Sequence, residues 1–196
     1  MAGAAESEQV ERVIAAAKRC CERWGRAKTT VDDIATEAGV SRATVYRLFP
    51  GGRDNLFEAM RQRETEDFFV ALSQTLAGAT SFEDLLVRAV VNATRALRED
   101  EHLRLMLATE PGEIVHELTV HGLPVILRVA TDFLTPWFEP YIDDARSAEL
   151  AELLSRLVIS YFLAPSTHYD LADPASAASF IAQFITPAFQ RQPVGR

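Results

Sequence analysis

Apolar residues recur every three or four positions along most of the chain. This spacing places them on one face of an α-helix, whereas a half-buried strand would alternate apolar and polar residues. We find no such alternation, no internal repeat and no low-complexity tract. The pattern therefore predicts an all-α protein of about nine helices, in which each helix buries one stripe in a shared core.

The first predicted helix covers residues 8–24, and its stripe consists of Val10, Val13, Ile14, Ala17, Cys21 and Trp24. We interpret Trp24, the last member, as a packing residue. Further helices are predicted over residues 54–77, 81–97, 102–109, 113–120, 124–138, 147–163 and from 173 onward. Ser81 is followed three residues later by an acidic residue, which is a capping pair, and we expect Ser147 to start its helix. Asp173 and Pro174 suit the opening of the last helix.

The most informative stretch predicts two short helices, over residues 31–38 and 41–49, joined by a tight turn. Thr30 can cap the first helix, because its hydroxyl accepts an otherwise unpaired backbone N–H. Gly39 can end that helix in the left-handed conformation without a Cβ penalty. Ser41 can then cap the second helix, and a proline with two glycines stops it.

The second of these helices has two different faces at 100° per residue. Val45, Leu48 and Phe49 fall on one side, where they can pack against the first helix. The opposite side carries Arg42, Ala43, Tyr46 and Arg47, with Thr44 at its edge. A pinned helix that presents such residues suits the DNA major groove, where arginine can pair with a guanine edge. The alternative is an ordinary helical hairpin with a solvated face; the joint pattern of caps, turn and stop favours DNA binding.

This segment resembles the DNA-binding region of TetR-family (tetracycline-repressor-like) transcriptional regulators. The matching residues are Thr30-Val31, Ile34-Ala35, Ala38-Gly39-Val40-Ser41, Thr44, Tyr46, Phe49 and Leu56. One departure is visible, because the family usually has a lysine three residues after the phenylalanine. Here Gly51-Gly52 lengthens the loop, and Arg53 stands in that role.

The resemblance implies a helix-turn-helix DNA-binding domain over residues 1–55 and a helical effector-binding and dimerisation domain over 56–196. The implied partner is a double-stranded DNA operator. Arg42 and Arg47 are our candidates for base edges, with Ala43 and Thr44 nearby, and Ser41 starts the helix that carries them. We expect the other predicted DNA-contacting residues, Thr30, Tyr46 and Arg53, to bind phosphates.

The net charge of −8 is unusual for a DNA-binding protein, but the charge is unevenly distributed. Residues 1–65 carry 11 basic and 10 acidic side chains, whereas residues 66–196 carry 9 basic and 18 acidic ones. DNA affinity responds to the local charge that faces phosphates. The acidic remainder would discourage indiscriminate binding to nucleic acid or anionic membranes.

The resemblance also implies a small-molecule effector, and we expect a mainly hydrophobic one. The candidate lining residues are Phe68, Phe69, Leu86, Val90, Leu103, Met106, Phe133, Trp137, Tyr161 and Phe162. Such side chains can line a pocket or fill a solid core, and each one alone fits the core better. The prolines and glycines between Glu110 and Pro124 suggest mobile walls, which favours a pocket.

We expect a homodimer through the last two long helices, because their apolar surfaces could be buried in a four-helix interface. The alternative is that those surfaces close only their own core. Two-fold symmetry would suit a DNA reader of this type, whose half-sites lie about one helical turn, or a multiple of it, apart.

Other classes of function find little support in the sequence. There is no phosphate-binding glycine loop or nucleophile elbow, so an enzyme is disfavoured, and no cofactor is predicted. The histidines lack metal-site spacing, so no metal is predicted. Cys20 and Cys21 fit reduced packing residues better than a redox pair. No apolar run spans a membrane and no export signal is apparent, which predicts a cytoplasmic protein. A DNA-binding regulator or architectural protein without an effector remains the alternative, and repressor and activator are not distinguished.

Overall fold

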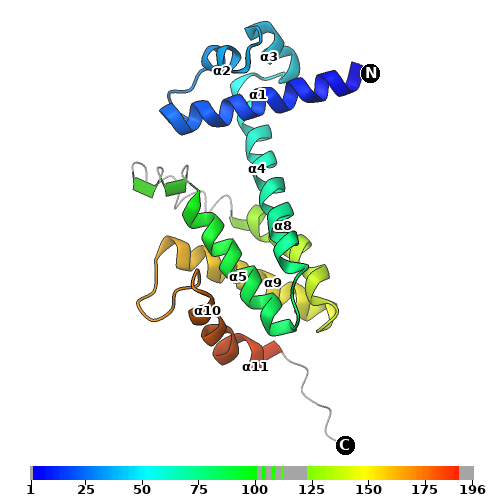
Figure 1. Ribbon diagram of the computed structural model, residues 1–196, viewed down its shortest axis with the longest axis vertical. Coiled ribbons are helices and arrows are strands. Elements are labelled where there is room, and N and C mark those ends of the chain that lie inside the picture. The colour runs from blue at the N-terminus through cyan, green and yellow to red at the C-terminus, as the bar shows by residue number, and fades with distance from the viewer. Residues whose placement is uncertain (1, 101–102, 105–106, 109–111, 113–122, 190–196) are drawn as a thin grey trace, which may run out of the picture. The chain divides into compact units, whose positions relative to one another are not determined.

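The computed structural model describes residues 2–100, 103–104, 107–108, 112 and 123–189 (Figure 1). In these residues the protein is helical and contains no strand, so the all-α prediction is confirmed. The chain divides into two compact units, Met1–Phe68 and Phe69–Arg196. Helix α4 (Arg53–Leu76) crosses the boundary between them.

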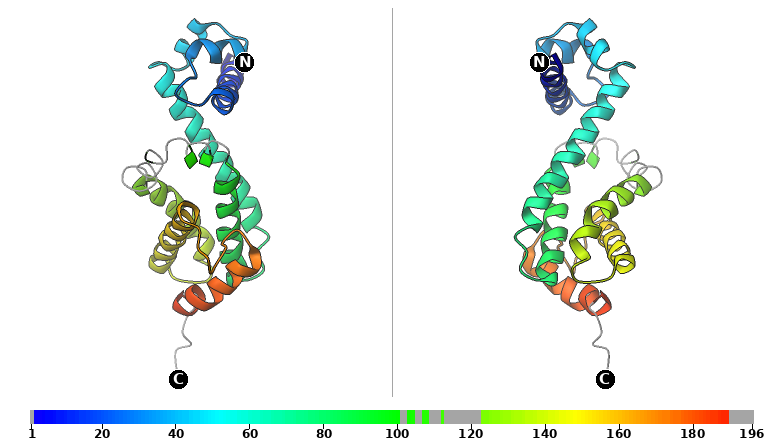
Figure 2. Two further views of the ribbon diagram at one scale, coloured as in Figure 1. Left: turned by 90° about the vertical axis from the view of Figure 1, so that its left-hand side faces the viewer. Right: turned by 90° about the vertical axis from the view of Figure 1, so that its right-hand side faces the viewer.

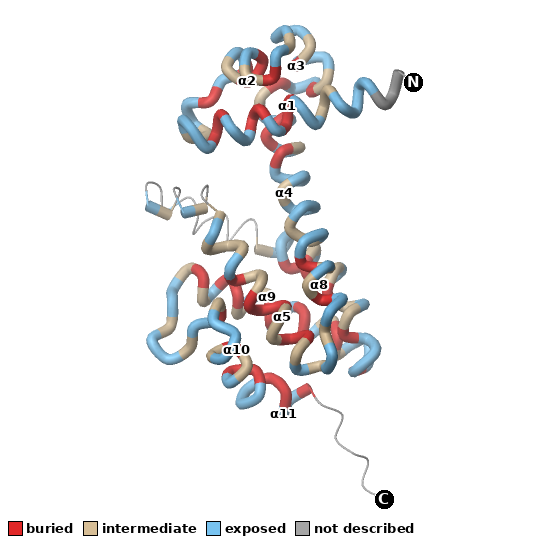
Figure 3. Tube along the Cα trace, in the orientation of Figure 1, coloured by how far each residue is buried: buried red, intermediate tan, exposed pale blue. Residues whose placement is uncertain are grey.

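Unit 1 contains α1 (Ala2–Trp24), α2 (Val31–Ala38), α3 (Arg42–Leu48) and the first part of α4. Helix α1 begins earlier than predicted, because residues 2–7 include good helix formers such as alanine and glutamate. Helix α1 packs on α2, and α2 packs on α3. Figure 3 marks the buried residues of these helices in red, and they form one hydrophobic cluster. The core includes Val13, Ala17, Cys21, Ile34, Ala38, Val45, Phe49, Leu56 and Phe57.

The interpretation of Trp24 as a packing residue was wrong. The residue is 41% exposed, and the guanidinium of Arg23 lies 5.3 Å from the centre of its ring. Helix α1 ends at Trp24, and Gly25 turns the chain with a φ of 78°. The ring therefore lies beyond the part of α1 that is packed in the core.

Unit 2 contains the end of α4, then α5 (Phe82–Glu99), α8 (Leu123–Phe138) and α9 (Asp144–Leu163). It closes with α10 (Pro174–Phe180), the π-helical turn η2 (Ile181–Ile185) and α11 (Thr186–Phe189). Helices α8 and α9 pack side by side, and α5 packs on both α9 and α10 (Figure 2). The largest fully buried side chains of this unit are Leu76, Leu86, Phe138, Leu150, Leu154, Leu171 and Ile181.

Two predicted helix starts in unit 2 are confirmed. The Ser81 hydroxyl accepts the backbone N–H of Asp84 at 3.1 Å and caps α5. Asp173 caps α10 in the same way, with Pro174 in the first turn. The last helix is less regular than expected, because it widens into η2 just before Pro187. A proline lacks the N–H for the usual bond to the residue four positions earlier, which favours such a rearrangement.

Helix α9 does not start at Ser147, as we predicted from its hydroxyl. Asp143 caps the helix by accepting the backbone N–H of Arg146 at 3.1 Å. The extra turn buries Ser147, whose hydroxyl has no hydrogen-bond partner in the described part of the chain. Aspartate and serine cap equally well, so the sequence alone did not decide between them.

Some predictions concern residues outside the described ones. Of the expected helices over 102–109 and 113–120, only 103–104 and 107–108 of the first are described, and both pairs are helical. Met106 and three of the histidines (His102, His116 and His121) also lie outside. None of the described helices is long and apolar enough to cross a membrane.

The cap of α9 offers a direct test of the fold. We expect Asp143→Ala to lower the free energy of unfolding by about 1 kcal/mol, because the first turn of α9 loses its acceptor. Ser147→Ala removes a buried hydroxyl without a partner, so it should be neutral or stabilising. Urea unfolding followed by circular dichroism measures both variants. The reverse ranking would show that Ser147 is the true cap.

Candidate nucleic-acid interface

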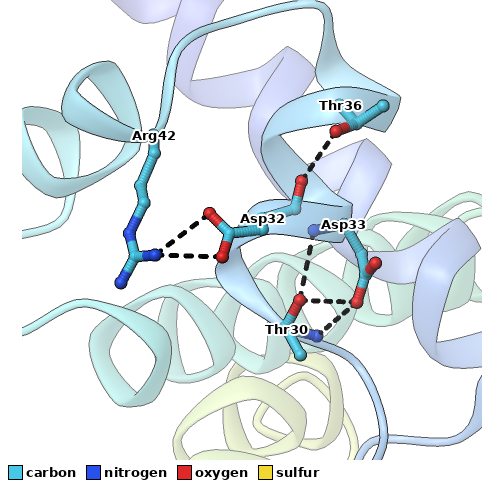
Figure 4. A network of polar contacts seen from close by, with 5 residues as sticks. All are labelled: Thr30, Asp32, Asp33, Thr36 and Arg42. Atoms are coloured by element: carbon cyan, nitrogen blue, oxygen red, sulfur yellow. Dashed lines mark hydrogen bonds and ion pairs between the residues drawn. The ribbon is translucent and has the colours of Figure 1, made fainter.

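Helix α2 is capped at its start by Thr30 and closed at its end by Gly39. The Thr30 hydroxyl accepts the backbone N–H of Asp33 at 3.2 Å, while the Asp33 carboxylate accepts the N–H of Thr30 at 2.9 Å (Figure 4). The Thr30 hydroxyl also donates to the Asp33 carboxylate at 2.6 Å. This hydrogen bond and the one from the Thr30 backbone N–H hold the pKa of Asp33 below its usual value. Gly39 has a φ of 66°, so the chain turns there as predicted.

Helix α3 starts immediately after the turn. The Ser41 hydroxyl accepts the N–H of Thr44 at 3.1 Å and shares a 2.9 Å hydrogen bond with the Thr44 hydroxyl. Val45 is fully buried and Phe49 nearly so, whereas Leu48 is half-buried. The pinned face of α3 is therefore the predicted one.

The opposite face of α3 is turned to solvent. Arg42, Ala43, Tyr46 and Arg47 are exposed, and Thr44 is half-buried at the edge. These predicted site residues are thus open to solvent, apart from the half-buried Thr44. A short helix held by its apolar side, with two guanidinium groups and a phenol outward, has the form of a major-groove reader.

Both outward arginines have carboxylate partners. The Arg42 guanidinium lies 2.9 Å from the Asp32 carboxylate and 5.5 Å from the centre of the Tyr46 ring. Arg47 Nη1 lies 2.5 Å from Glu6 Oε1, and its Nη2 donates to Gln9 at 3.2 Å. Sequence reasoning did not identify these partners, because Glu6 and Asp32 lie on α1 and α2, 41 and 10 residues before the arginines that they contact.

The two-glycine loop, Gly51-Gly52, departs from the family pattern, and Gly52 lies close to the ring of Tyr46. Gly52 has a φ of 69°, and a Cβ there would come within 2.7 Å of Cε1 of the Tyr46 ring. Gly51 has a φ of 106° and lies against the amide of Asn55. A side chain at either position would be strained. The loop therefore fixes where the tyrosine lies.

Arg53 contacts backbone carbonyls. Its Nε donates to the carbonyl of Thr29 at 2.9 Å, its Nη2 donates to the carbonyl of Arg26, and its guanidinium lies 4.7 Å from the centre of the Phe57 ring. A lysine could not reproduce this two-armed contact. Arg53 thus links the start of α4 to the loop between α1 and α2, a contact that the sequence did not indicate.

The cysteines of unit 1 are buried in its core. Burial raises the pKa of both thiols. A thiol that stays protonated is a poor nucleophile, so the arrangement favours packing over redox chemistry. Among the described residues, no three His, Cys, Asp or Glu side chains gather as metal ligands.

The candidate effector residues differ in how far they are buried. Leu86, Val90 and Phe162 are buried, and the half-buried ones are Phe68, Phe69, Leu103, Phe133, Trp137 and Tyr161. The rings of Phe69 and Phe133 lie 4.5 Å apart between their centres, on α4 and α8. The ring of Tyr161 on α9 lies 5.8 Å from the ring of Phe180, measured between their centres.

Tyr161 lines a shallow open groove of about 450 Å³ on α9, α10 and η2. The groove is mainly apolar, and its edge includes Leu153 and Phe184, which are 36% and 50% exposed. Its other lining residues are Leu157, Ser166, His168, Tyr169, Phe180 and Ile185. The surface belongs to the last two long helices, where an interface was expected.

Comparison with known proteins agrees with this geometry. The sequence profile of "Bacterial regulatory proteins, tetR family" matches residues 13–60, which include α2, α3 and the start of α4. A helix-turn-helix-type transcriptional regulator of Mycobacterium tuberculosis, Rv1255c, is 29% identical over 180 residues, which cover 91% of this chain and 86% of that protein.

Solved structures share the fold. The TetR family repressor AlkX from Dietzia sp., implicated in biodegradation of n-alkanes, has a TM-score of 0.64 at 23% identity and covers 90% of this chain and 92% of its own. The fatty acid degradation regulator FadR from Bacillus halodurans has a TM-score of 0.56 at 21% identity, with 88% and 93% covered. The outward-facing α3 and these similarities lead to one conclusion: over residues 13–60 the chain carries the DNA-binding domain of the tetR family of bacterial regulatory proteins, and it is a DNA-binding transcriptional regulator.

Proposed function

We propose that the protein is a repressor that leaves its operator when a mainly hydrophobic small molecule binds. DNA binding is assigned to residues 1–55, and effector binding and dimerisation to residues 56–196. The observation that carries the DNA part is α3, whose Val45 side is buried while Arg42 and Arg47 face solvent.

In this proposal α3 enters the major groove. Arg42 and Arg47 pair with base edges, and Ala43 and Thr44 lie close enough to contact bases or their methyl groups. Thr30 and Tyr46 bind phosphates, which sets the register of the helix on the duplex. Arg53 strengthens binding either through a phosphate or by holding the loop that precedes Thr30.

The groove on α9, α10 and η2 supports a homodimer. Its apolar side chains, Leu153 and Phe184 among them, would be covered by the same face of a second copy, as a two-fold interface requires. Two copies of α3 would then address two half-sites about 34–36 Å apart, or a multiple of that distance.

A hydrophobic effector fits the composition of unit 2. The Phe69 and Phe133 rings, with Trp137 on the same helix as Phe133, offer half-buried aromatic surface that an alkyl or ring compound could contact. Helix α4 belongs to both units, so a change in its position could reach α3. An effector acts only if it binds one arrangement of the two reading helices better than the other.

The base-edge assignment predicts a loss of sequence preference. Arg42→Ala and Arg47→Ala should each weaken operator binding by about one to two orders of magnitude, with a smaller effect on random duplex, because bidentate base contacts are lost. Fluorescence anisotropy with an operator selected from random duplexes measures both. Arg53→Ala is the comparison, since it should weaken all duplexes alike. Equal losses on operator and random DNA for Arg42→Ala would exclude its base contact.

The dimer assignment predicts that a charge in the groove separates the subunits. Phe184→Glu should sediment as a monomer, because an unpaired carboxylate would be buried in an apolar interface. Val70→Glu, which alters another exposed apolar side chain of unit 2, should leave the dimer intact. If Phe184→Glu remained a dimer, the interface would have to lie outside this groove.

The effector assignment predicts a ligand that stabilises the protein and weakens operator binding. Two proteins of similar fold carry names linked to n-alkanes and fatty acid degradation, so fatty acids and acyl thioesters are the first probes. At about 100 times its Kd, an effector adds about 2.7 kcal/mol of stability, which thermal shift detects. Phe133→Ala should abolish this shift. If the wild-type protein is a dimer and none of these compounds changes its operator binding, a regulator without an effector would be favoured.

A further inference from the structure

Each arginine that we place at a base edge is held by a carboxylate from a neighbouring helix. Arg42 Nη1 donates to both oxygens of Asp32, at 2.9 and 3.2 Å (Figure 4). Arg47 Nη1 donates to Glu6 at 2.5 Å. Helix α3 carries no other basic residue, so the two carboxylates together engage its whole cationic charge.

Folding gains little from these two pairs. The four side chains are between 55% and 62% exposed, and exposed ion pairs contribute little to stability because water and salt screen them. Asp33, the next residue, already completes the cap of α2 with Thr30. The Asp32 carboxylate is directed instead toward Arg42 (Figure 4).

The pairs affect phosphates and base edges differently. A phosphate attracts a guanidinium through its full negative charge, and a carboxylate beside that guanidinium both cancels the attraction and repels the phosphate. A guanine edge instead offers two uncharged acceptors in a fixed geometry, so its pairing with arginine depends more on orientation than on net charge. A neighbouring carboxylate therefore weakens phosphate binding more than base reading.

We propose that Asp32 and Glu6 are specificity-determining residues, which keep Arg42 and Arg47 from binding phosphates of random DNA while leaving them able to pair with a base edge. The inference rests on the proposed function, in which these arginines read bases. It adds that these two acidic residues set the ratio of the affinity for operator DNA to the affinity for random DNA.

The test compares Asp32→Asn and Glu6→Gln with Glu11→Gln. Glu11 lies on the same helix as Glu6 and pairs with Arg63 on α4, and Arg63 keeps Glu66 and Asp67 within 3.6 Å when Glu11 is changed. The control thus makes the same change in net charge without releasing an arginine of α3. The probes are a random duplex and an operator selected from random-sequence duplexes by the wild-type protein, titrated over a series of salt concentrations.

Asp32→Asn and Glu6→Gln should each bind random duplex about two- to fivefold more tightly than Glu11→Gln does. Operator affinity should change less, so the specificity ratio falls. The slope of log K against log salt for random duplex should steepen by about 0.9 for each variant, because one more phosphate is engaged. A role confined to folding would change the melting temperature but not this slope.

The inference would be overturned if Asp32→Asn and Glu6→Gln matched Glu11→Gln in two respects. These are the ratio of operator affinity to random-duplex affinity and the slope of log K against log salt. If the wild type still prefers its operator and loses that preference in Arg47→Ala, the proposed function stands and only the role of the carboxylates fails. A wild-type protein that binds no duplex at low salt would overturn both.

Discussion

The DNA-reading surface depends on the burial of Val45 and Phe49 beneath α3. This helix has only seven residues, and a helix of that length is unstable in water without packing. Its apolar side is held in the same core as Ile34 of α2 and Phe57 of α4. Val45 is fully buried, while Arg42, Tyr46 and Arg47 on the same helix are exposed. The tight packing of one face thus determines what the other face can present.

Local signals predicted the parts of the structure that local chemistry determines. Thr30, Gly39 and Ser41 define the two short helices through hydrogen bonds and a left-handed turn among residues close in sequence. Contacts between distant residues were not predictable in this way. Asp143 and Ser147 are equally good caps, and tertiary packing chose between them. Trp24 followed the helical stripe but lies where the core has ended.

The candidate site shows the same division. Helical periodicity was sufficient to place Arg47 opposite Val45, because residues two positions apart are separated by about 200° at 3.6 residues per turn. It did not explain the exposure of Arg42, which lies three residues before Val45 and therefore nearer to its side of the helix. The partners of the two arginines were not predictable, since Glu6 and Asp32 come from other helices at separations that no motif encodes. The effector residues were the least predictable, because aromatic side chains at helical spacing fit a core and a cavity equally well.

The contacts of Arg53 have a mechanical consequence for regulation. At the first turn of α4, this side chain is bonded to the loop after α1, and one residue earlier Gly52 lies against Tyr46 of α3. These contacts tie the first turn of α4 to the other helices of unit 1, so a movement of that turn would carry them with it. In a dimer, effector binding would then change the distance between the two copies of α3, and so how well they match the spacing of an inverted repeat. The sequence preference of each α3 for its own half of the repeat would stay the same.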